Sequence, residues 1–299
     1  MSRGVVIFGV NNDRIEYVRL ALMAAAFVKA NMGNETRVCL ISDNDSLGQY
    51  RDGTGQFNDE FNKWIDDVVT IDSTGSLNER TYRDTQYYSF KANFKNESRA
   101  SVYDLSPYDE TLLIDCDYLV CNDGLNGVWG NSEEVMINKH AIGLMHNQLS
   151  PEEIRLNAYG IKMYWATVVY FRKGEKARQL FSLIEHIKEN WDFYKLTYDF
   201  PGHLYRNDYA FSIAIHILNG FVEDSFAVDL PEKVLLSALD LDQLYGITDK
   251  KTLHFFANSS TETWKFYATR TSGVSVHCMN KLSLLNNYKE IMEVLSEGT

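Results

Sequence analysis

The feature that most constrains the fold is a strand–helix–strand pattern at the start of the chain. Gly4 to Val10 (GVVIFGV) is a short, β-branched apolar run that ends in Asn-Asn-Asp, as a buried strand followed by a loop does. Ile15 to Asn31 carries apolar residues at helical spacing, and Gly33 follows as a C-terminal cap. Thr36 to Ile41 (TRVCLI) is a second strand. This order predicts an α/β fold, Rossmann-type, with a mixed, mostly parallel sheet flanked by helices.

Further apolar segments along the chain extend this sheet and cover it. The helix expected from Glu175 has one apolar face, made by Ala177, Leu180, Ile184 and Ile187. The polar composition of two stretches predicts loops at Asp45 to Lys63 and an irregular chain over the sheet edge at Ser73 to Asn96. Other predicted strands are Val68 to Ile71, Thr111 to Ile114, Val135 to Leu144, Tyr164 to Phe171 and Leu253 to Ala257, and the other predicted helices are Asp208 to Leu218 and Leu282 to Leu295.

Composition limits the class of protein. The 299 residues are 45% hydrophobic, enough for one large core, and no change in composition marks a domain boundary. No stretch approaches the roughly 20 apolar residues of a membrane span, and the start, MSRGVVIFGVNN, lacks a signal peptide's apolar run. We therefore expect a cytoplasmic protein without membrane association. The net charge of -12 argues against broad binding to a polyanion and leaves acidic residues to hold a divalent cation.

The four cysteines also point to a reduced protein. They form no close pair, and most lie in or beside predicted strands, where cysteine behaves as a small apolar residue. Typical zinc-ligand spacing is absent. The cysteines are Cys39, Cys116, Cys121 and Cys278.

Two carboxylates interrupt an otherwise apolar run in Glu110 to Asp123 (ETLLIDCDYLVCND). In an extended segment Asp115 and Asp117 would point to the same side, and adjacent carboxylates repel unless a cation lies between them. Hard divalent ions such as Mg²⁺ and Mn²⁺ take oxygen ligands, and Mg²⁺ often binds substrate phosphates as well. This pattern predicts a divalent metal site that a bound diphosphate completes.

Other polar residues fall at predicted strand ends. In open parallel sheets, ligands bind beyond the carboxyl ends of the strands. We therefore expect Asn11, Asn12, Asp13 and Asp43 to share a crevice with the two aspartates. Turn and cap roles are the alternative interpretation for these residues.

Four segments resemble glycosyltransferases of the GT-A fold, which use nucleotide sugars. ASVYDLSPYDETLLIDCDYLVCND is similar to their DxD region, with Arg99 as the basic residue before the strand. Val10 to Asp13 is similar to their nucleoside-binding start. MYWATVVYFRKGEKARQLFSLI resembles their later strand-then-helix unit, and GVSVHCMNK resembles the late segment that supplies a histidine and a lysine. Trp165-Ala166-Thr167 replaces the family's Asn-Ala-Gly-like triplet, and the step from His277 to Lys281 is shorter than in the retaining glycogenin-like family.

The resemblance implies a metal-dependent glycosyltransferase, a hexosyl- or pentosyltransferase of the retaining type, with Mn²⁺ or Mg²⁺ as cofactor and a UDP-sugar as donor. The implied metal ligands are Asp115, Asp117 and His277. Asp208 would orient or deprotonate the acceptor hydroxyl (a helix N-cap is its alternative role), and Lys281 would stabilise the leaving diphosphate. The implied donor-binding residues are Val10, Asn11, Asn12, Asp43, Arg99, Asp115, Cys116, Asp117, Trp165, Ala166, Thr167 and Lys281.

The same resemblance implies a single GT-A-like catalytic domain over residues 1–299. Residues 1–123 would form its nucleotide-sugar-binding half. Residues 124–299 would form the acceptor half and a C-terminal closing segment.

RTYRD and SRASVYDLSPYDETLLIDCDY also resemble glycosyltransferases of large tailed phages. That resemblance implies 5-hydroxymethylcytosine in phage DNA as acceptor, glucose or arabinose as the sugar, and the host cytoplasm as location. The basic and aromatic stretch Arg80 to Lys95 would bind a DNA strand by stacking and phosphate contacts, or it is an ordinary surface loop. The implied acceptor-binding residues are Arg80, Arg83, His203 and Arg206.

Three alternatives stay open. The enzyme could act on a glycan or a small molecule, the chain could be a non-catalytic nucleotide-sugar-binding protein, or it could be a metal-dependent nucleotidyltransferase. The remaining histidines stand at no ligand spacing and carry no prediction of a site; they are His140, His146, His186, His216 and His254.

Overall fold

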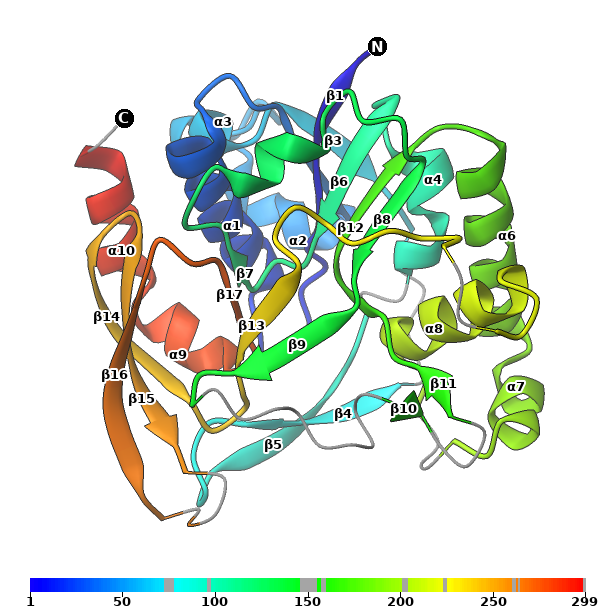
Figure 1. Cartoon of the computed structure of the whole chain (residues 1–299). Helices are drawn as coiled ribbons and strands as arrows, with labels where there is room; N and C mark the ends of the chain where they lie inside the picture. Colours follow the sequence, from blue (N-terminus) through cyan, green and yellow to red (C-terminus); the bar gives the residue numbers. More distant parts are fainter. Residues whose placement is uncertain are drawn as a thin grey trace.

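The computed structural model describes residues 1–72, 78–95, 98–145, 155–156, 160–200, 204–222, 225–259, 262 and 264–297. Its centre is a six-stranded sheet (Figure 1) in which only β12 runs against the other strands. The strands, in spatial order, are β3 (Asp67–Thr70), β2 (Val38–Ser42), β1 (Arg3–Phe8), β6 (Glu110–Ile114), β12 (Trp165–Arg172) and β8 (Val135–Asn138). The predicted mixed, mostly parallel sheet flanked by helices is confirmed.

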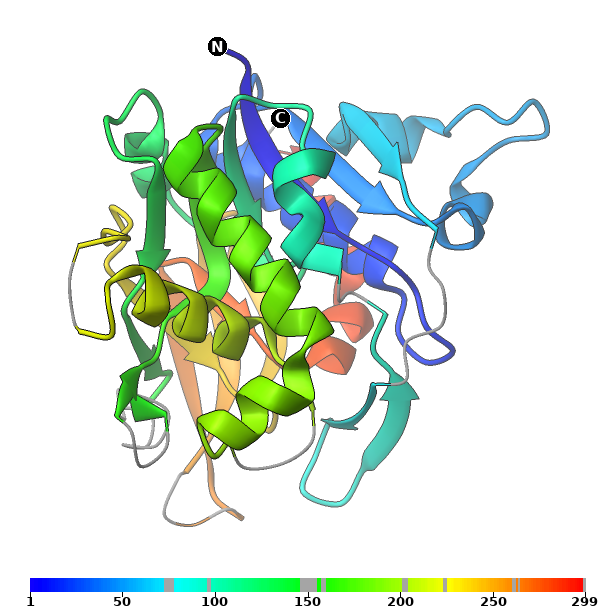
Figure 2. The ribbon, with the colours of Figure 1, turned by 90° about the vertical axis from the view of Figure 1, so that its right-hand side faces the viewer.

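Helices cover both faces of this sheet. Val5 and Ile7 of β1 belong to the core cluster that includes α1 (Tyr17–Met32), whereas Val6 and Phe8 belong to the cluster under α6 (Glu175–Glu189) and α8 (Asn207–Leu218). Figure 2 shows α6, α8 and α4 (Val102–Leu105) on the near face, with α1 behind the sheet. The alternation along β1 follows from the two-residue period of a strand, and burial on both faces explains its continuous apolar run.

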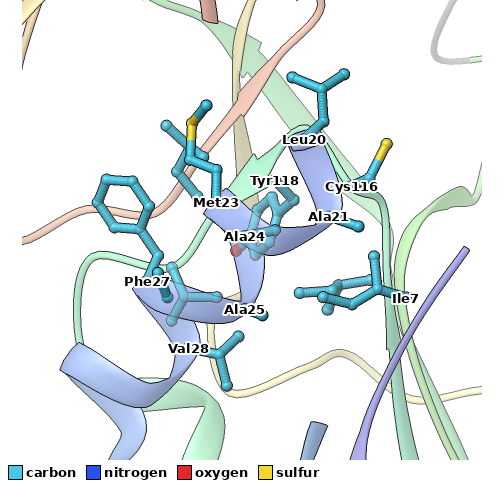
Figure 3. Packing of buried hydrophobic residues seen from close by; sticks show 14 of the residues in the cluster. Ile7, Leu20, Ala21, Met23, Ala24, Ala25, Phe27, Val28, Cys116 and Tyr118 are labelled. Atoms are coloured by element: carbon cyan, nitrogen blue, oxygen red, sulfur yellow. The ribbon is translucent and has the colours of Figure 1, made fainter. Parts of the chain in front are cut away.

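Small residues let α1 approach the sheet closely (Figure 3). Ala21, Ala24 and Ala25 lie on this helix and are fully buried. A Cβ at Gly9 would lie 3.1 Å from the Tyr17 carbonyl oxygen, so the missing side chain allows the loop after β1 to pass under the helix. The helix ends before Gly33, whose φ of 117° few other residues adopt.

Smaller sheets lie beside the central six-stranded sheet, and most of their strands come from the second half of the chain (Figure 1). A four-stranded sheet contains β7 (Tyr118–Leu119), β17 (Val276–Cys278), β13 (Val234–Ala238) and β9 (His140–Gly143). Three antiparallel strands follow β13, namely β14 (Gln243–Asp249), β15 (Thr252–Asn258) and β16 (Phe266–Ser272). The remaining elements are the pairs β4 (Glu79–Arg83) with β5 (Ser89–Asn93) and β10 (Arg155–Leu156) with β11 (Ile161–Lys162), and the helices α2 (Asn44–Leu47), η1 (Gly48–Tyr50), α3 (Asp59–Trp64), η2 (Ser98–Ser101), η3 (Gly124–Val128), α7 (Trp191–Thr197), α9 (Lys281–Asn286) and α10 (Tyr288–Glu297).

Four predictions of local structure were wrong. The segment predicted as loops forms α2, η1 and α3, because the side chains of Asp43 and Asn58 cap the first turns of α2 and α3. The described part of Ser73 to Asn96 is largely the β4–β5 hairpin. Val135 to Leu144 divides into β8 and β9, which belong to different sheets. The predicted closing helix divides at Asn287 into α9 and α10.

Two further observations concern the cysteines and the length of the helices. All four cysteines are free and buried. Among the helices that the structure describes, none combines the length and apolarity that a bilayer crossing requires.

Candidate metal centre

Asp115 and Asp117 follow β6 in a tight β-turn. The Tyr118 amide donates to the Asp115 carbonyl at 3.0 Å and closes the turn, and the Cys278 amide donates to the Asp117 carbonyl at 2.8 Å. The extended segment predicted for these residues is therefore wrong. Both carboxylates nevertheless face one cavity, because the turn and its bond to β17 fix their directions.

A distant strand brings a histidine to these carboxylates. β17 pairs antiparallel with β7, which places His277 opposite Tyr118. His277 Nε2 lies 3.5 Å from Asp117 Oδ1 and 4.0 Å from Asp115 Oδ2. Its Nδ1 lies 3.4 Å from Thr167 Oγ1, so Nε2 is the nitrogen that faces the carboxylates.

This cluster fits a divalent metal ion. One ligand atom from each of Asp115, Asp117 and His277 lies within 4.8 Å of the others, and it is the one such group found in the described part of the chain. Two carboxylates and an imidazole can ligate such an ion, and water or phosphate oxygens can complete its coordination.

Two cations hold the carboxylates in place. Lys281, the first residue of α9, places Nζ 2.7 Å from Asp117 Oδ2. Arg99, whose side chain is 4% exposed, forms an ion pair with Asp115 and donates to the Ala166 carbonyl at 2.7 Å. The cluster therefore combines two carboxylates with two fixed positive charges.

Burial and these charges shift the pKa values in opposite directions. Burial raises the pKa of both carboxyls. At Asp117 the charges of Lys281 and His277 outweigh burial and hold the pKa well below its usual range. The pKa of Asp115 stays above its usual value, because burial outweighs the opposing charge of Arg99. Burial lowers the pKa of His277, but Asp117 more than reverses this, so that pKa is raised.

The cluster lines a cavity of about 430 Å³. Seven of the predicted donor-binding residues line it, and Arg80, Arg206 and Asp208 from the predicted acceptor and catalytic sets line it too. The lining residues are Phe8, Tyr17, Arg80, Thr81, Tyr82, Phe94, Arg99, Asp115, Cys116, Asp117, Ala166, Thr167, Leu204, Arg206, Asn207, Asp208, Asp240, His277, Met279 and Lys281.

Other predicted donor residues lie outside this cavity. Asn11 and Asn12 line a second cavity together with Asp13, so the expected single crevice is divided. The Asn11 side chain accepts from the Val18 amide at 2.9 Å, and Asp43 caps α2. Asn12, Val10 and Trp165 are also absent from the lining of the metal-centre cavity. The donor-binding roles of these residues stay predictions.

Both oxygens of the Asp208 carboxylate have partners. Oδ1 accepts from the Ala166 amide at 2.9 Å, and Oδ2 accepts from Arg206 at 3.0 Å. The carboxylate therefore anchors the start of β12 to the start of α8. Its proposed work on an acceptor hydroxyl stays a prediction.

The predicted acceptor residues are divided in the same way. Arg80 stacks on Phe94, with its guanidinium carbon 3.5 Å from the ring centre, and donates to the Tyr205 carbonyl at 3.2 Å. Arg83 is exposed on β4 and is not part of the cavity lining. His203 lies outside the described residues.

The β4–β5 hairpin turns two of its four aromatic side chains toward the protein. Tyr82 and Phe90 stack on each other with ring centres 5.4 Å apart, and the Tyr82 hydroxyl lies 2.9 Å from that of Tyr17. Tyr87 and Tyr88, at the hairpin turn, are exposed. The basic and aromatic stretch therefore presents two exposed rings and not a continuous stacking surface.

Sequence reasoning missed several cavity residues. Tyr17, Phe94 and Met279 gave no signal, since aromatic and Met residues at such positions usually belong to a core. Asp240, in contrast, has a recognisable sequence signal. LSALDLD repeats the pattern of an apolar strand followed by DxD, and its first aspartate lines the cavity.

Comparisons with known proteins give distant structural matches. No protein-family model matches the chain, and no curated protein sequence matches it. The glycosyltransferase GlyE in Streptococcus pneumoniae TIGR4 is 16% identical, with 76% of this chain and 45% of GlyE covered and a TM-score of 0.39. The galactosyltransferase LgtC, in complex with donor and acceptor sugar analogs, is 12% identical, with 78% of this chain and 73% of LgtC covered and a TM-score of 0.41. The chain thus spans less than half of the length of GlyE.

Proposed function

We propose that this chain is a metal-dependent glycosyltransferase that moves a sugar from a nucleotide-sugar donor to an acceptor hydroxyl. The observation that carries the proposal is the convergence of Asp115, Asp117 and His277, with Lys281 beside them, at one end of the central sheet in a single cavity. Two carboxylates held this close to each other and to an imidazole nitrogen form a ligand set for a divalent ion, in addition to their pairing with Arg99 and Lys281. A diphosphate is the substrate group that such a cation and a nearby lysine both stabilise.

The residues would divide the work as follows. Asp115, Asp117 and His277 would hold the divalent ion, which supplies Lewis-acid stabilisation of the leaving diphosphate. Lys281 would exchange part of its contact with Asp117 for a diphosphate oxygen. The bond from the anomeric carbon to the diphosphate breaks, the acceptor oxygen bonds to that carbon, and the proton of the acceptor hydroxyl passes to the leaving diphosphate.

Finer features of the proposal rest on the sequence resemblance. We propose a UDP-sugar of the glucose or arabinose class as donor, Mn²⁺ or Mg²⁺ as the ion, and retention of configuration. The proposed acceptor is 5-hydroxymethylcytosine in phage DNA, flipped out of the duplex to reach the cavity. The net charge of -12 and the inward-facing rings of Tyr82 and Phe90 weigh against extended contacts with a DNA strand.

The function is tested first without an acceptor. UDP-sugars are incubated with Mn²⁺, and UDP release to water is measured for the wild type, Asp117→Asn and Asp192→Asn. Asp192 is exposed on α7 and serves as the matched control. We expect metal-dependent release by the wild type and the control, and at least a hundredfold loss in Asp117→Asn. If the wild type neither releases UDP nor transfers a sugar with any donor, the proposal that the protein is an enzyme fails.

Two further measurements separate the alternatives. Stabilisation of the wild type by a UDP-sugar with Mn²⁺, without any turnover, would favour a non-catalytic binding protein. Release of pyrophosphate in place of UDP would favour a nucleotidyltransferase.

The acceptor is tested with two DNA duplexes of the same sequence, one with cytosine and one with 5-hydroxymethylcytosine. Sugar transfer to the modified duplex alone supports the DNA acceptor. Transfer to neither duplex, together with transfer to free saccharides, would favour the glycan acceptor.

A further inference from the structure

Asp240 stands out among the charged residues of the metal-centre cavity, because no partner for its carboxylate is found in the described part of the chain. Asp115, Asp117 and Asp208 all form ion pairs. Among the hydrogen bonds and ion pairs between residues that the structure describes, none involves the Asp240 carboxylate, although its side chain is half-buried and lines the cavity. An unpaired carboxylate in such a place is costly unless a ligand uses it.

The fold holds Asp240 beside the metal ligands. β13 runs parallel to β17, with Ala238 opposite Cys278, and the Met279 amide donates to the Ala238 carbonyl at 2.8 Å. Asp240 follows two residues after Ala238. Its position is therefore tied to the segment that carries His277 and Lys281.

A second aspartate keeps this turn rigid. Asp242 Oδ2 accepts from the Leu239 amide at 2.7 Å, and the Asp242 amide donates to the Leu239 carbonyl at 2.9 Å. Asp242 Oδ1 accepts from the Asn258 amide at 2.6 Å, which ties the turn to β15. Asp242 is thus the structural member of the DxD pair, and Asp240 is the member left free to bind.

The surroundings of Asp240 do not neutralise its charge by contact, and burial outweighs the nearby cations, so its pKa is raised. Burial raises the pKa of Asp240, and the charges of Lys281, Arg83, His277 and Arg206 oppose that rise. None of these cations forms an ion pair with Asp240 among the described residues. The carboxylate can therefore accept a hydrogen bond from a neutral hydroxyl, whereas it would repel a phosphate.

We propose that Asp240 is the residue that binds the acceptor, accepting a hydrogen bond from its reactive hydroxyl and holding the oxygen toward the anomeric carbon of the donor sugar. The proposal rests on the proposed glycosyltransferase function and assigns to Asp240 the acceptor contact that sequence reasoning gave to Asp208. It also defines the acceptor chemistry at this point of the cavity as a neutral hydroxyl group.

The test compares Asp240→Asn, Asp208→Asn and Asp192→Asn in UDP release from the UDP-sugar that stabilises the wild type most. Water takes the acceptor position in this assay. We expect Asp240→Asn to lower kcat about tenfold or more with KM for the donor unchanged, and to keep the full rise in melting temperature that UDP and Mn²⁺ produce. Asp208→Asn should instead lower the melting temperature of the protein without ligand, because the two oxygens of Asp208 accept hydrogen bonds from the Ala166 amide and from Arg206.

Each outcome has a distinct meaning. An unchanged kcat in Asp240→Asn overturns the assignment, and so does loss of the UDP and Mn²⁺ stabilisation, which would make Asp240 part of the donor site. Both results leave the proposed function intact. A wild type that releases no UDP from any donor overturns the proposed function, and the role of Asp240 with it.

Discussion

Arg99→Met tests whether the metal centre is held together by its buried cation. The Arg99 side chain is 4% exposed, while that of its partner Asp115 is 31% exposed. The substitution removes the ion pair and the hydrogen bond to the Ala166 carbonyl, and it leaves a partly buried carboxylate without a counter-charge. Breaking a buried pair typically costs about 3–5 kcal/mol.

The exposure of Asp115 puts the expected cost at the low end of that range, about 3 kcal/mol, because water can solvate part of the carboxylate. For a chain of this length each kcal/mol corresponds to about 2 °C, so the melting temperature should fall by about 6 °C. The measurement is differential scanning calorimetry in EDTA, which keeps bound metal from masking the loss.

Arg178→Met is the matched control. Arg178 pairs with Glu175 at 2.6 Å, but both side chains are more than half exposed, and such solvent-exposed pairs add little to stability. We expect a change of about 1 °C. If Arg99→Met also moves the melting temperature by no more than this, the ion pair with Asp115 is fully solvated and the electrostatic account of the centre fails.

Two other substitutions probe the fold away from the cavity. Phe27→Ala removes a fully buried ring from α1 and should cost about 3–5 kcal/mol in the free energy of unfolding by urea; a loss below about 1 kcal/mol would contradict the packing in Figure 3. Glu232→Gln should stabilise the protein at pH 8 and change little at pH 4. Burial raises the pKa of Glu232, so its contribution favours folding below the ordinary pKa and is lost as the pH rises through the folded value. Equal urea midpoints for wild type and variant at pH 8 would refute this.

Much of the central sheet was predictable from the sequence. The strands β1, β2 and β6 are buried on both faces, so each appears as a continuous apolar run. The helix α6 was predictable for the opposite reason, since only one of its faces is buried.

The missed elements share a physical cause. The exposed positions of β4 and β5 are all polar, and only Tyr82, Phe90 and Ala92 supply inward apolar side chains, so the pairing of these strands depends on contact with the rest of the molecule. The helices α2 and α3 are only four and six residues long, and such helices depend on caps and packing more than on propensity.

The three residues of the candidate metal centre were predicted only in part by local pattern. Asp115 and Asp117 were found because charges are rarely left in a buried run. His277 was assigned through the family resemblance, and the structure brings it to Asp117 through the pairing of β17 with β7. No local sequence signal encodes that pairing.

The sequence by itself determined the α/β class, the order of the main elements and the pair of carboxylates at the end of β6. Tertiary structure alone decided which of the acidic side chains form hydrogen bonds and ion pairs with other described residues. Asp208 and Asp240 are both aspartates in the sequence. Both oxygens of Asp208 are bound within the fold, whereas Asp240 lines the cavity with no hydrogen bond or ion pair to any residue that the structure describes. Hydrogen bonds between distant segments make that distinction, because they form only when the chain has folded.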